Sequence, residues 1–317
     1  MSGLESSRSA AVMGTIVSIR ATSARAGDDE TARREQAISR GLEWFDDIER
    51  RCTRFNPGSE LMRLTARAGE AVRVSPMVFE TIRFALAVAQ ETGGAFDPTI
   101  GCRMEDLGFN REHRTGTAVH LSPTAAGPVT FKDVALDHEE QTVRLRRPLV
   151  LDLGAVAKGL AIDMAVRELS GFAGFAVDAG GDLYLGGTNP DGHPWSVGIR
   201  HPRRDGELID TLTVTNLAVC TSGDYERRAS GDAGGHHIID PRTGRSAPAV
   251  ASVTVVAPSA LLADALGTAA FVLGPAEGIR LLERHGVDGL IISPELERHA
   301  TPGLNSEVRR HGCAVAG

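Results

Sequence analysis

Hydrophobic residues recur with a helical period in several stretches of the chain. In residues 28–52 the apolar side chains lie three or four positions apart, as Ile38 and Leu42 do. This spacing places them on one face and predicts a long amphipathic helix. Either Asp28 or Asp29 is expected to cap its start.

Four further helices are predicted, and residues typical of helix starts precede three of them. Ser75 with Pro76 is typical of an N-cap and a first helical position, Ser259 of an N-cap, and Pro275 of another first position. The predicted helices cover residues 76–92, 155–169, 260–273 and 275–285, and residues 59–64 are expected to form one or two helical turns.

Shorter apolar or alternating segments, separated by turn residues such as Asp191-Gly192, predict strands. They are residues 12–21, 129–136, 142–145, 149–153, 175–185, 195–200, 208–215, 238–239, 252–256 and 290–292. Because hairpin-length turns join most strands and the helices gather near both ends, the expected fold class is α+β with largely antiparallel sheets.

One domain is expected, since no linker divides the chain. It is predicted to span residues 12–300, between a disordered N-terminal tail, residues 1–11, and a C-terminal tail, residues 301–317. Residues 115–128 are polar and rich in turn formers, which predicts a surface loop.

Composition excludes several classes of protein. Acidic and basic residues are mixed along the chain, with a net charge of −7, so no basic groove for nucleic acid is expected. The four cysteines form no C-x-x-C pair, which favours reduced thiols. Residues 1–11 lack an apolar signal core, and no segment approaches the roughly 18 apolar residues of a membrane span. A cytoplasmic protein without an integral membrane segment is therefore expected.

Residues 151–159 combine a carboxylate, a glycine turn and a lysine in the first turns of a helix. Asp152 precedes Gly154, and Lys158 follows it. A helix N-terminus favours a phosphate, which Lys158 could pair with while Asp152 holds a ligand donor or a metal. A purely structural connection between strand and helix fits the spacing equally well, since this is no Walker loop.

Asp264 and Thr268 lie four residues apart, so their oxygens share one helix face. Carboxylate plus hydroxyl suits Mg²⁺, which keeps several waters and takes phosphate oxygens from a substrate. The alternative is a capping aspartate and a threonine bonded to the backbone. The small residues around them leave room for a bulky ligand beside this helix.

Two short segments have residues that let backbone N–H groups approach a phosphate. One contains Thr221, Ser222 and Gly223, and the other contains Gly180 and Gly181. A β-bulge explains the glycine pair as well as a phosphate site does.

His237 is a candidate general base, because it precedes a short strand and a tight turn. Its neighbour His236 is expected to point to the opposite face, which argues against a zinc site built on both. In residues 92–98, Phe96 beside Asp97 suggests a contact with a flat ring, or else a buried loop anchor.

Taken in order, eight segments resemble the ApbE family, the FAD:protein FMN transferases, and together they cover nearly the whole chain past residue 12. They are residues 13–15, 54–61, 93–98, 152–163, 179–182, 221–225, 237–244 and 252–274. The resemblance implies the family's ApbE-like fold, and implies that Mg²⁺ is held by Asp264, Thr268 and the backbone carbonyl of Ala155. It further implies an FAD site formed by Met13, Phe55, Ala95, Phe96, Asp97, Asp152, Lys158, Gly180, Gly181, Thr221, Ser222, Gly223 and His237.

The implied reaction moves FMN from FAD to a serine or threonine of an acceptor flavoprotein, within a short flavinylation motif, and releases AMP. His237 matches the histidine that helps to deprotonate the acceptor hydroxyl. Asp178 and Phe55 stand where many members carry asparagine and a tyrosine or tryptophan, and the usual lipoprotein signal is missing. Two alternatives stay open: an FAD pyrophosphatase that yields FMN and AMP, and an FAD-binding protein without catalysis.

Overall fold

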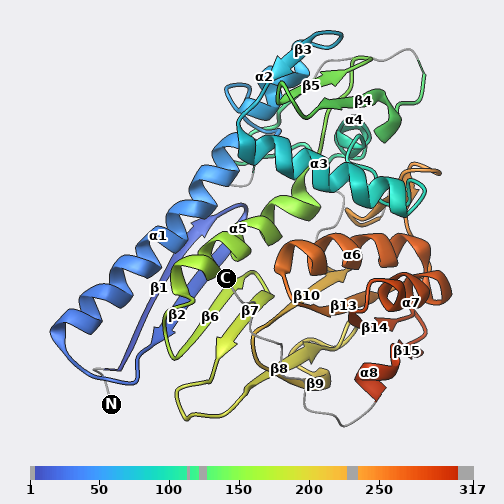
Figure 1. Ribbon diagram of the computed structural model, residues 1–317. Coiled ribbons are helices and arrows are strands. Elements are labelled where there is room, and N and C mark those ends of the chain that lie inside the picture. The colour runs from blue at the N-terminus through green and yellow to red at the C-terminus, as the bar shows by residue number, and fades with distance from the viewer. Residues whose placement is uncertain (1–3, 113–114, 121–126, 227–234, 306–317) are drawn as a thin grey trace.

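An eight-stranded sheet forms the centre of the molecule in the computed structural model, which describes residues 4–112, 115–120, 127–226 and 235–305 (Figure 1). Its strand order is β1-β2-β6-β7-β10-β13-β14-β15, and every neighbouring pair is antiparallel. The strands are β1 (Glu5–Val12), β2 (Thr15–Thr22), β6 (Gly174–Ala179), β7 (Asp182–Gly187), β10 (Leu217–Gly223), β13 (Ser252–Ala257), β14 (Asp288–Ile292) and β15 (Arg298–Ala300). The predicted fold class is confirmed.

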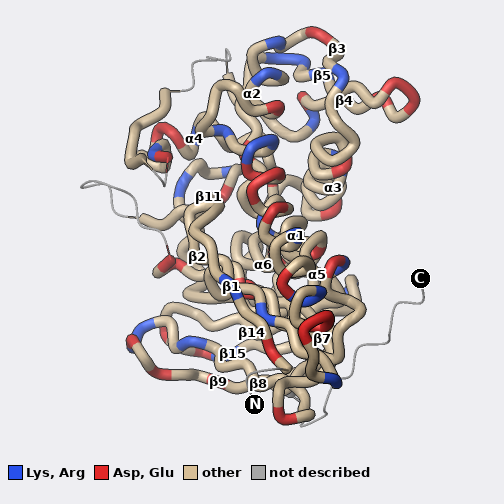
Figure 2. The backbone as a smooth tube through the Cα atoms, turned by 90° about the vertical axis from the view of Figure 1, so that its left-hand side faces the viewer, with Lys and Arg blue, Asp and Glu red and all other residues tan. Residues whose placement is uncertain are grey.

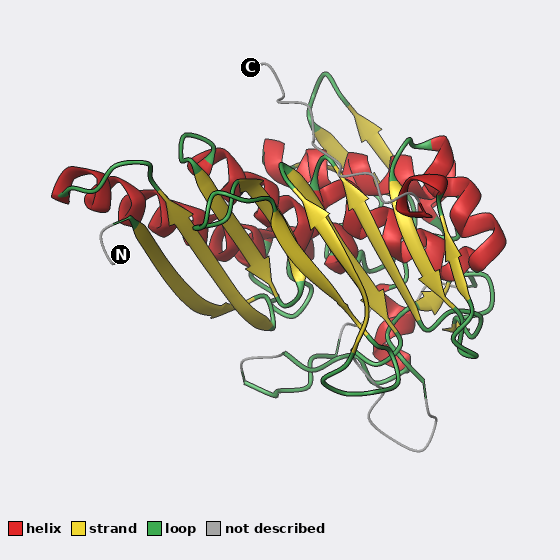
Figure 3. Cartoon of the chain, turned by 90° about the horizontal axis from the view of Figure 1, so that it is seen from below, coloured by secondary structure: helices red, strands yellow, loops and turns green. Residues whose placement is uncertain are grey.

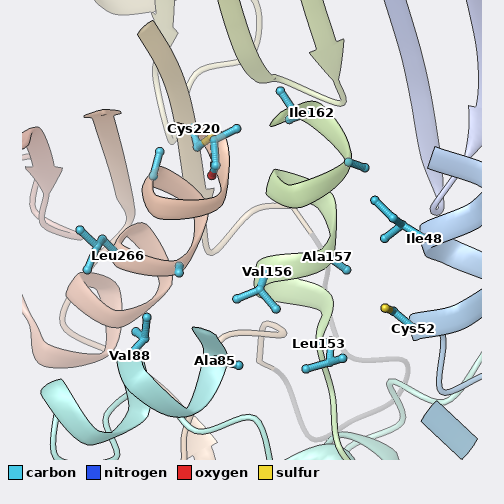
Figure 4. Close-up of a cluster of buried hydrophobic side chains, with 14 of the residues drawn as sticks. Ile48, Cys52, Ala85, Val88, Leu153, Val156, Ala157, Ile162, Cys220 and Leu266 are labelled. Atoms are coloured by element: carbon cyan, nitrogen blue, oxygen red, sulfur yellow. Dashed lines mark hydrogen bonds between the residues drawn. The ribbon is translucent and has the colours of Figure 1, made fainter. Parts of the chain in front are cut away.

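Helices cover one face of this sheet (Figure 3), and four of them contact its strands directly. They are α1 (Asp28–Cys52), α5 (Gly154–Leu169), α6 (Ala260–Leu273) and α7 (Pro275–Arg284). Within this layer α5 lies between α1, which carries Ile48 and Cys52, and α6, which carries Leu266 (Figure 4). The apolar stripe that predicted α1 is buried here, because Ile38, Phe45 and Ile48 are at most 1% exposed.

The remaining elements lie outside this sheet and its four helices. Above the sheet in Figure 1 lie α2 (Glu60–Thr65), α3 (Pro76–Glu91), α4 (Gly101–Asp106), η1 (Phe131–Asp133), β3 (Ala71–Arg73), β4 (Val134–Asp137) and β5 (Thr142–Leu145). The others are the hairpin β8 (Trp195–Arg200) and β9 (Leu208–Val214), the hairpin β11 (Ile239–Asp240) and β12 (Arg245–Ser246), and α8 (Pro302–Asn305).

The two serines predicted to be N-caps do cap their helices. Ser75 accepts a hydrogen bond from the backbone N–H of Val78, and Ser259 accepts one from Leu262. The prediction for α1 is wrong in one detail, since the N-cap is Gly27 and not an aspartate. Asp28 and Asp29 instead lie in the first turn, where their charge suits the helix dipole.

The expected N-terminal tail is wrong for residues 5–11, which belong to β1 and pair with β2 along its whole length. Residues 149–153, expected to be a strand, are buried but form none. The N–H of Asp152 donates to the carbonyl of Pro98, and that of Gly101 to Val150, so this segment pairs with a loop. Of the expected C-terminal tail, residues 301–305 include α8. Residues 1–3 and 306–317, and parts of the loop 115–128, lie outside the described residues.

Two tight turns meet at one end of the sheet. Met13 and Gly14 connect β1 to β2, and Gly180 and Gly181 connect β6 to β7, all four with positive φ. The glycine pair is therefore a hairpin turn and not a bulge. A Cβ at Gly180 would lie 2.2 Å from the Oγ1 of Thr15, so only glycine allows the two turns to approach this closely.

Positions of Lys and Arg are interspersed with positions of Asp and Glu along the backbone of the described residues (Figure 2). None of the helices in those residues is long and apolar enough to cross a membrane.

Candidate functional site

A cleft of about 640 Å³ lies where the two turns, the end of β10 and the starts of α5 and α6 come together. Residues from position 14 to position 268 line it, so nearly the whole chain contributes. The sequence-predicted residues that line it are Phe55, Ala95, Phe96, Asp97, Asp152, Ala155, Lys158, Gly180, Thr221, Ser222, Gly223, His237, Asp264 and Thr268.

Two predicted residues do not line the cleft. The side chain of Met13 packs against the hydrophobic core, and its neighbours Gly14 and Thr15 line the cleft instead. Gly181 is exposed, and its N–H donates to a carboxylate oxygen of Asp178 at 2.8 Å.

Two buried carboxylates of the cleft share one ammonium group. Lys158 on α5 forms an ion pair with Asp182, and its Nζ lies 3.8 Å from a carboxylate oxygen of Asp264 on α6. Asp182 is 3% exposed and also accepts the N–H of Thr221 at 2.9 Å. Because two carboxylates face one ammonium, the group is net negative and suits a further cation.

The donors beside this group fit a hard divalent cation. Asp264 is 6% exposed and faces the cleft together with Thr268, one helical turn later, and with Ala155 at the start of α5. No cluster of three or more His, Cys, Asp or Glu within the described residues could hold a metal alone. Hydroxyl, carbonyl and water oxygens, with those of a bound phosphate, would have to complete the shell. Mg²⁺ accepts this kind of shell, whereas structural zinc does not.

Asp152 organises the start of α5. One of its oxygens accepts the N–H of Gly154 at 2.8 Å, and the other accepts Nε of Arg54 at 2.7 Å. The guanidinium of Arg54 also lies over the ring of Phe55, 4.2 Å from its centre. Asp152 therefore orients both an aromatic wall of the cleft and the helix end.

The carboxylate of Asp97 mainly accepts hydrogen bonds from its own loop. Its oxygens accept the N–H and the hydroxyl of Thr99, and the N–H of Phe131 at 3.0 Å. Burial raises the pKa of this carboxyl, while these hydrogen bonds lower it in part. The loop-anchor interpretation describes both residues, because Phe96 is only 5% exposed and belongs to the hydrophobic core. Both residues also line the cleft.

The two adjacent histidines lie in different environments, as their alternation predicted. His236 is 9% exposed, packs edge-on against Phe271, and lies with Nε2 3.0 Å from the carbonyl of Ala247. Its Nδ1 accepts the N–H of Ile238, and burial lowers its pKa, so the ring is neutral. His237 is half-buried and lines the cleft.

A family model described as the ApbE family matches residues 13–291 of the chain. The chain belongs to the ApbE family. It is similar to the FAD:protein FMN transferase of Treponema pallidum, with 33% identity over 96% of this chain and 89% of the relative. The FAD:protein FMN transferase of Vibrio cholerae is 30% identical over 78% of this chain and 76% of its own length.

The solved structure of an ApbE protein from Thermotoga maritima shares the fold. Its TM-score is 0.83 at 30% identity, covering 95% of this chain and 98% of the other. These relatives confirm the predicted family and, with it, the predicted class of enzyme, a flavin transferase.

No role was assigned from the sequence to three residues that the structure shows in or next to the cleft of this ApbE protein. Asp182 and Arg54 are nearly buried and form the ion pairs described above. Asp163 on α5 binds the start of α6. All three lie within segments that carried the resemblance, but their roles depend on partners at least 24 residues away along the chain.

Proposed function

We propose that this chain transfers FMN from FAD to a serine or threonine hydroxyl of an acceptor protein, with Mg²⁺ as cofactor and AMP as the leaving product. The observation that carries the proposal is the convergence of Asp264, Thr268, Lys158 and His237 on one cleft. A protein that only bound FAD would have no use for buried carboxylates and a histidine in the same cleft.

The cleft suits a dinucleotide. The start of α5, at Gly154 and Ala155, lines it with the positive end of a helix, which favours phosphate oxygens. Lys158 adds a positive charge nearby. Phe55 and Phe96 supply aromatic surface for a flat ring. About 640 Å³ lies within the usual range of roughly 300–1,000 Å³ for small-molecule sites.

Asp264, Thr268 and the carbonyl of Ala155 are the groups that would hold Mg²⁺. When bound, this ion would neutralise charge that develops on the diphosphate as the phosphoanhydride bond breaks. Lys158 stabilises the same charge from α5, and Asp182 holds its ammonium in place through the ion pair.

His237 would take the proton of the attacking hydroxyl. A serine or threonine hydroxyl is a poor nucleophile at neutral pH, and a positioned general base contributes typically about 10²–10⁴-fold. The new phosphoester bond joins the acceptor oxygen to the FMN phosphorus, and the oxygen that bridged the two phosphates leaves with AMP.

The test is incubation of the chain with FAD, Mg²⁺ and a candidate acceptor protein, followed by mass spectrometry. Transfer adds one FMN unit to the acceptor, whereas release of free FMN alone would mean hydrolysis. An unchanged FAD complex would mean binding without catalysis.

Asp264→Ala is expected to abolish transfer, because the metal loses its carboxylate ligand. Asp210→Ala is the matched control, since Asp210 pairs with Arg298 and neither residue lines the cleft. Wild-type turnover of Asp264→Ala at low Mg²⁺ would contradict the proposed site.

A further inference from the structure

The groups proposed to hold the metal and the diphosphate lie on two different helices. Ala155 and Lys158 belong to α5, and Asp264 and Thr268 belong to α6. The geometry of the site therefore depends on how these two helices are held relative to each other. The distance of 3.8 Å between Nζ of Lys158 and the carboxylate of Asp264 depends directly on it.

The two helices touch through backbone next to Lys158. A Cβ added to Gly159 would lie 2.5 Å from the carbonyl oxygen of Ala260 and 2.7 Å from Cα of Leu261. No side chain separates the helices at this point. The start of α6 is thus in direct contact with the turn of α5 that faces the cleft.

A carboxylate from α5 binds α6 at the same place. One oxygen of Asp163 accepts the N–H of Ala260 at 2.7 Å, and the other accepts the N–H of Leu261 at 3.0 Å. Both donors belong to the first turn of α6, where backbone N–H groups have no partner inside the helix. Asp163 lies one helical turn after Gly159, so the contact and the hydrogen bonds fasten the same crossing.

Ser259 caps α6 as well, but from within its own segment, by accepting the N–H of Leu262 at 3.3 Å. Ser259 can therefore stabilise α6 as a helix without fixing where α6 lies. Asp163 differs because its bonds join α6 to α5.

Burial of Asp163 is costly for stability. It raises the pKa of the carboxyl to about 6, although the two N–H groups and the charge of Arg167 lower it in part. Tyr184 and Cys220 lie within electrostatic range, and neither carries a charge that could offset the burial of a carboxylate. Asp163 does not line the cleft, so its charge serves the contact between the helices.

We propose that Asp163 is a positioning residue: by fastening the first turn of α6 to α5 beside Gly159, it sets the separation of Asp264 and Thr268 from Ala155 and Lys158, and through it the affinity for the divalent cation. This inference rests on the proposed function, which supplies the metal site. Groups that orient metal ligands without touching the metal typically change its affinity by about 10- to 100-fold.

The experiment titrates Mn²⁺ into the full chain with FAD present and follows free Mn²⁺ by electron paramagnetic resonance. Asp163→Ala is expected to bind Mn²⁺ roughly 10- to 100-fold more weakly than wild type. Asp163→Asn keeps one acceptor oxygen, and an intermediate loss is expected. This second variant carries the test if Asp163→Ala does not fold, as judged by circular dichroism.

Ser259→Ala is the matched control. It removes a cap from the same helix and is expected to leave the affinity for Mn²⁺ unchanged. Equal losses of affinity in the Ser259 and Asp163 variants would overturn the inference, as would wild-type affinity in the Asp163 variants. Asp264→Ala separates the proposed metal site from the positioning role of Asp163. If Asp264→Ala binds Mn²⁺ like wild type, the proposed metal site is wrong. If the affinity for Mn²⁺ depends on Asp264 but not on Asp163, only the positioning role is wrong.

Discussion

The contact between α5 and α6 can be widened by a single methyl group, at Gly159. In Gly159→Ala the new Cβ would begin 2.5 Å from the carbonyl oxygen of Ala260, about 0.9 Å short of ordinary van der Waals contact. The neighbouring atoms are backbone and cannot rotate away. The helices must therefore separate by about that distance, and Asp264 moves away from Lys158.

Stability and activity are expected to respond differently to this change. Overpacking costs about 1–3 kcal/mol, and replacing a helical glycine by alanine returns up to about 1 kcal/mol. The net loss in the free energy of unfolding is thus between about 0 and 3 kcal/mol. A displacement of about 1 Å in a catalytic site can cost about 10²-fold in rate. Flavin transfer should fall by about that factor while the chain stays folded.

The assay measures initial rates of FMN transfer beside urea unfolding. Gly278→Ala is the control, because its Cβ would lie 2.8 Å from the carbonyl oxygen of Ala270 and overpacks α6 from the side of α7. We expect it to lose similar stability but little activity. If Gly159→Ala kept the wild-type rate, or if Gly278→Ala lost as much activity, the spacing of α5 and α6 would not control the site.

Two further predictions concern titratable groups. His237→Ala should lower the rate of transfer by about 10²–10⁴-fold without changing the melting temperature. His236→Ala should lower the free energy of unfolding by about 1–3 kcal/mol and leave the rate per folded molecule unchanged. The reverse pattern would contradict His237 as the proposed base. The pKa of Asp163 is raised from 3.8 to about 6, so its protonated form stabilises the fold below pH 3.8 and this contribution is lost as the pH rises through 6. Relative to Asp163→Asn, the wild-type free energy of unfolding should fall by up to about 3 kcal/mol between pH 4 and pH 7, as urea titrations would measure; parallel curves for the two proteins would refute the burial argument.

Most helices could be predicted from the sequence, because capping residues and apolar spacing within each segment determine where they form. Ser75 and Ser259 cap the helices that follow, as their sequence positions indicated. The edge strand β1 escaped prediction because its sequence, ESSRSAAV, is largely polar and its hydrogen bonds come from β2. The strand predicted for residues 149–153 was wrong because their apolar side chains indicate burial and not strand pairing. These residues are buried, but the backbone hydrogen bonds that they form are with the loop around Pro98.

The site was predictable where residue types matched a familiar chemistry. Asp264, Thr268 and His237 do face one cleft. Asp182 and Asp163 were missed, because a carboxylate next to a glycine turn or inside a helix gives no sign of the lysine or the helix start that it binds. Such pairings exist only once the strands and helices have packed.

Residues from position 14 to position 268 line the cleft, so a ligand bound there would contact segments from most of the chain. A dinucleotide bound in the proposed site would act as a non-covalent cross-link between the first hairpin and the last third of the chain. Its binding free energy would add to the stability of the entire fold, by about 2.7 kcal/mol at a hundred times the dissociation constant. A proteolytic fragment that lacks either end would lose part of the cleft wall, so the substrate is expected to protect the intact chain and not its pieces.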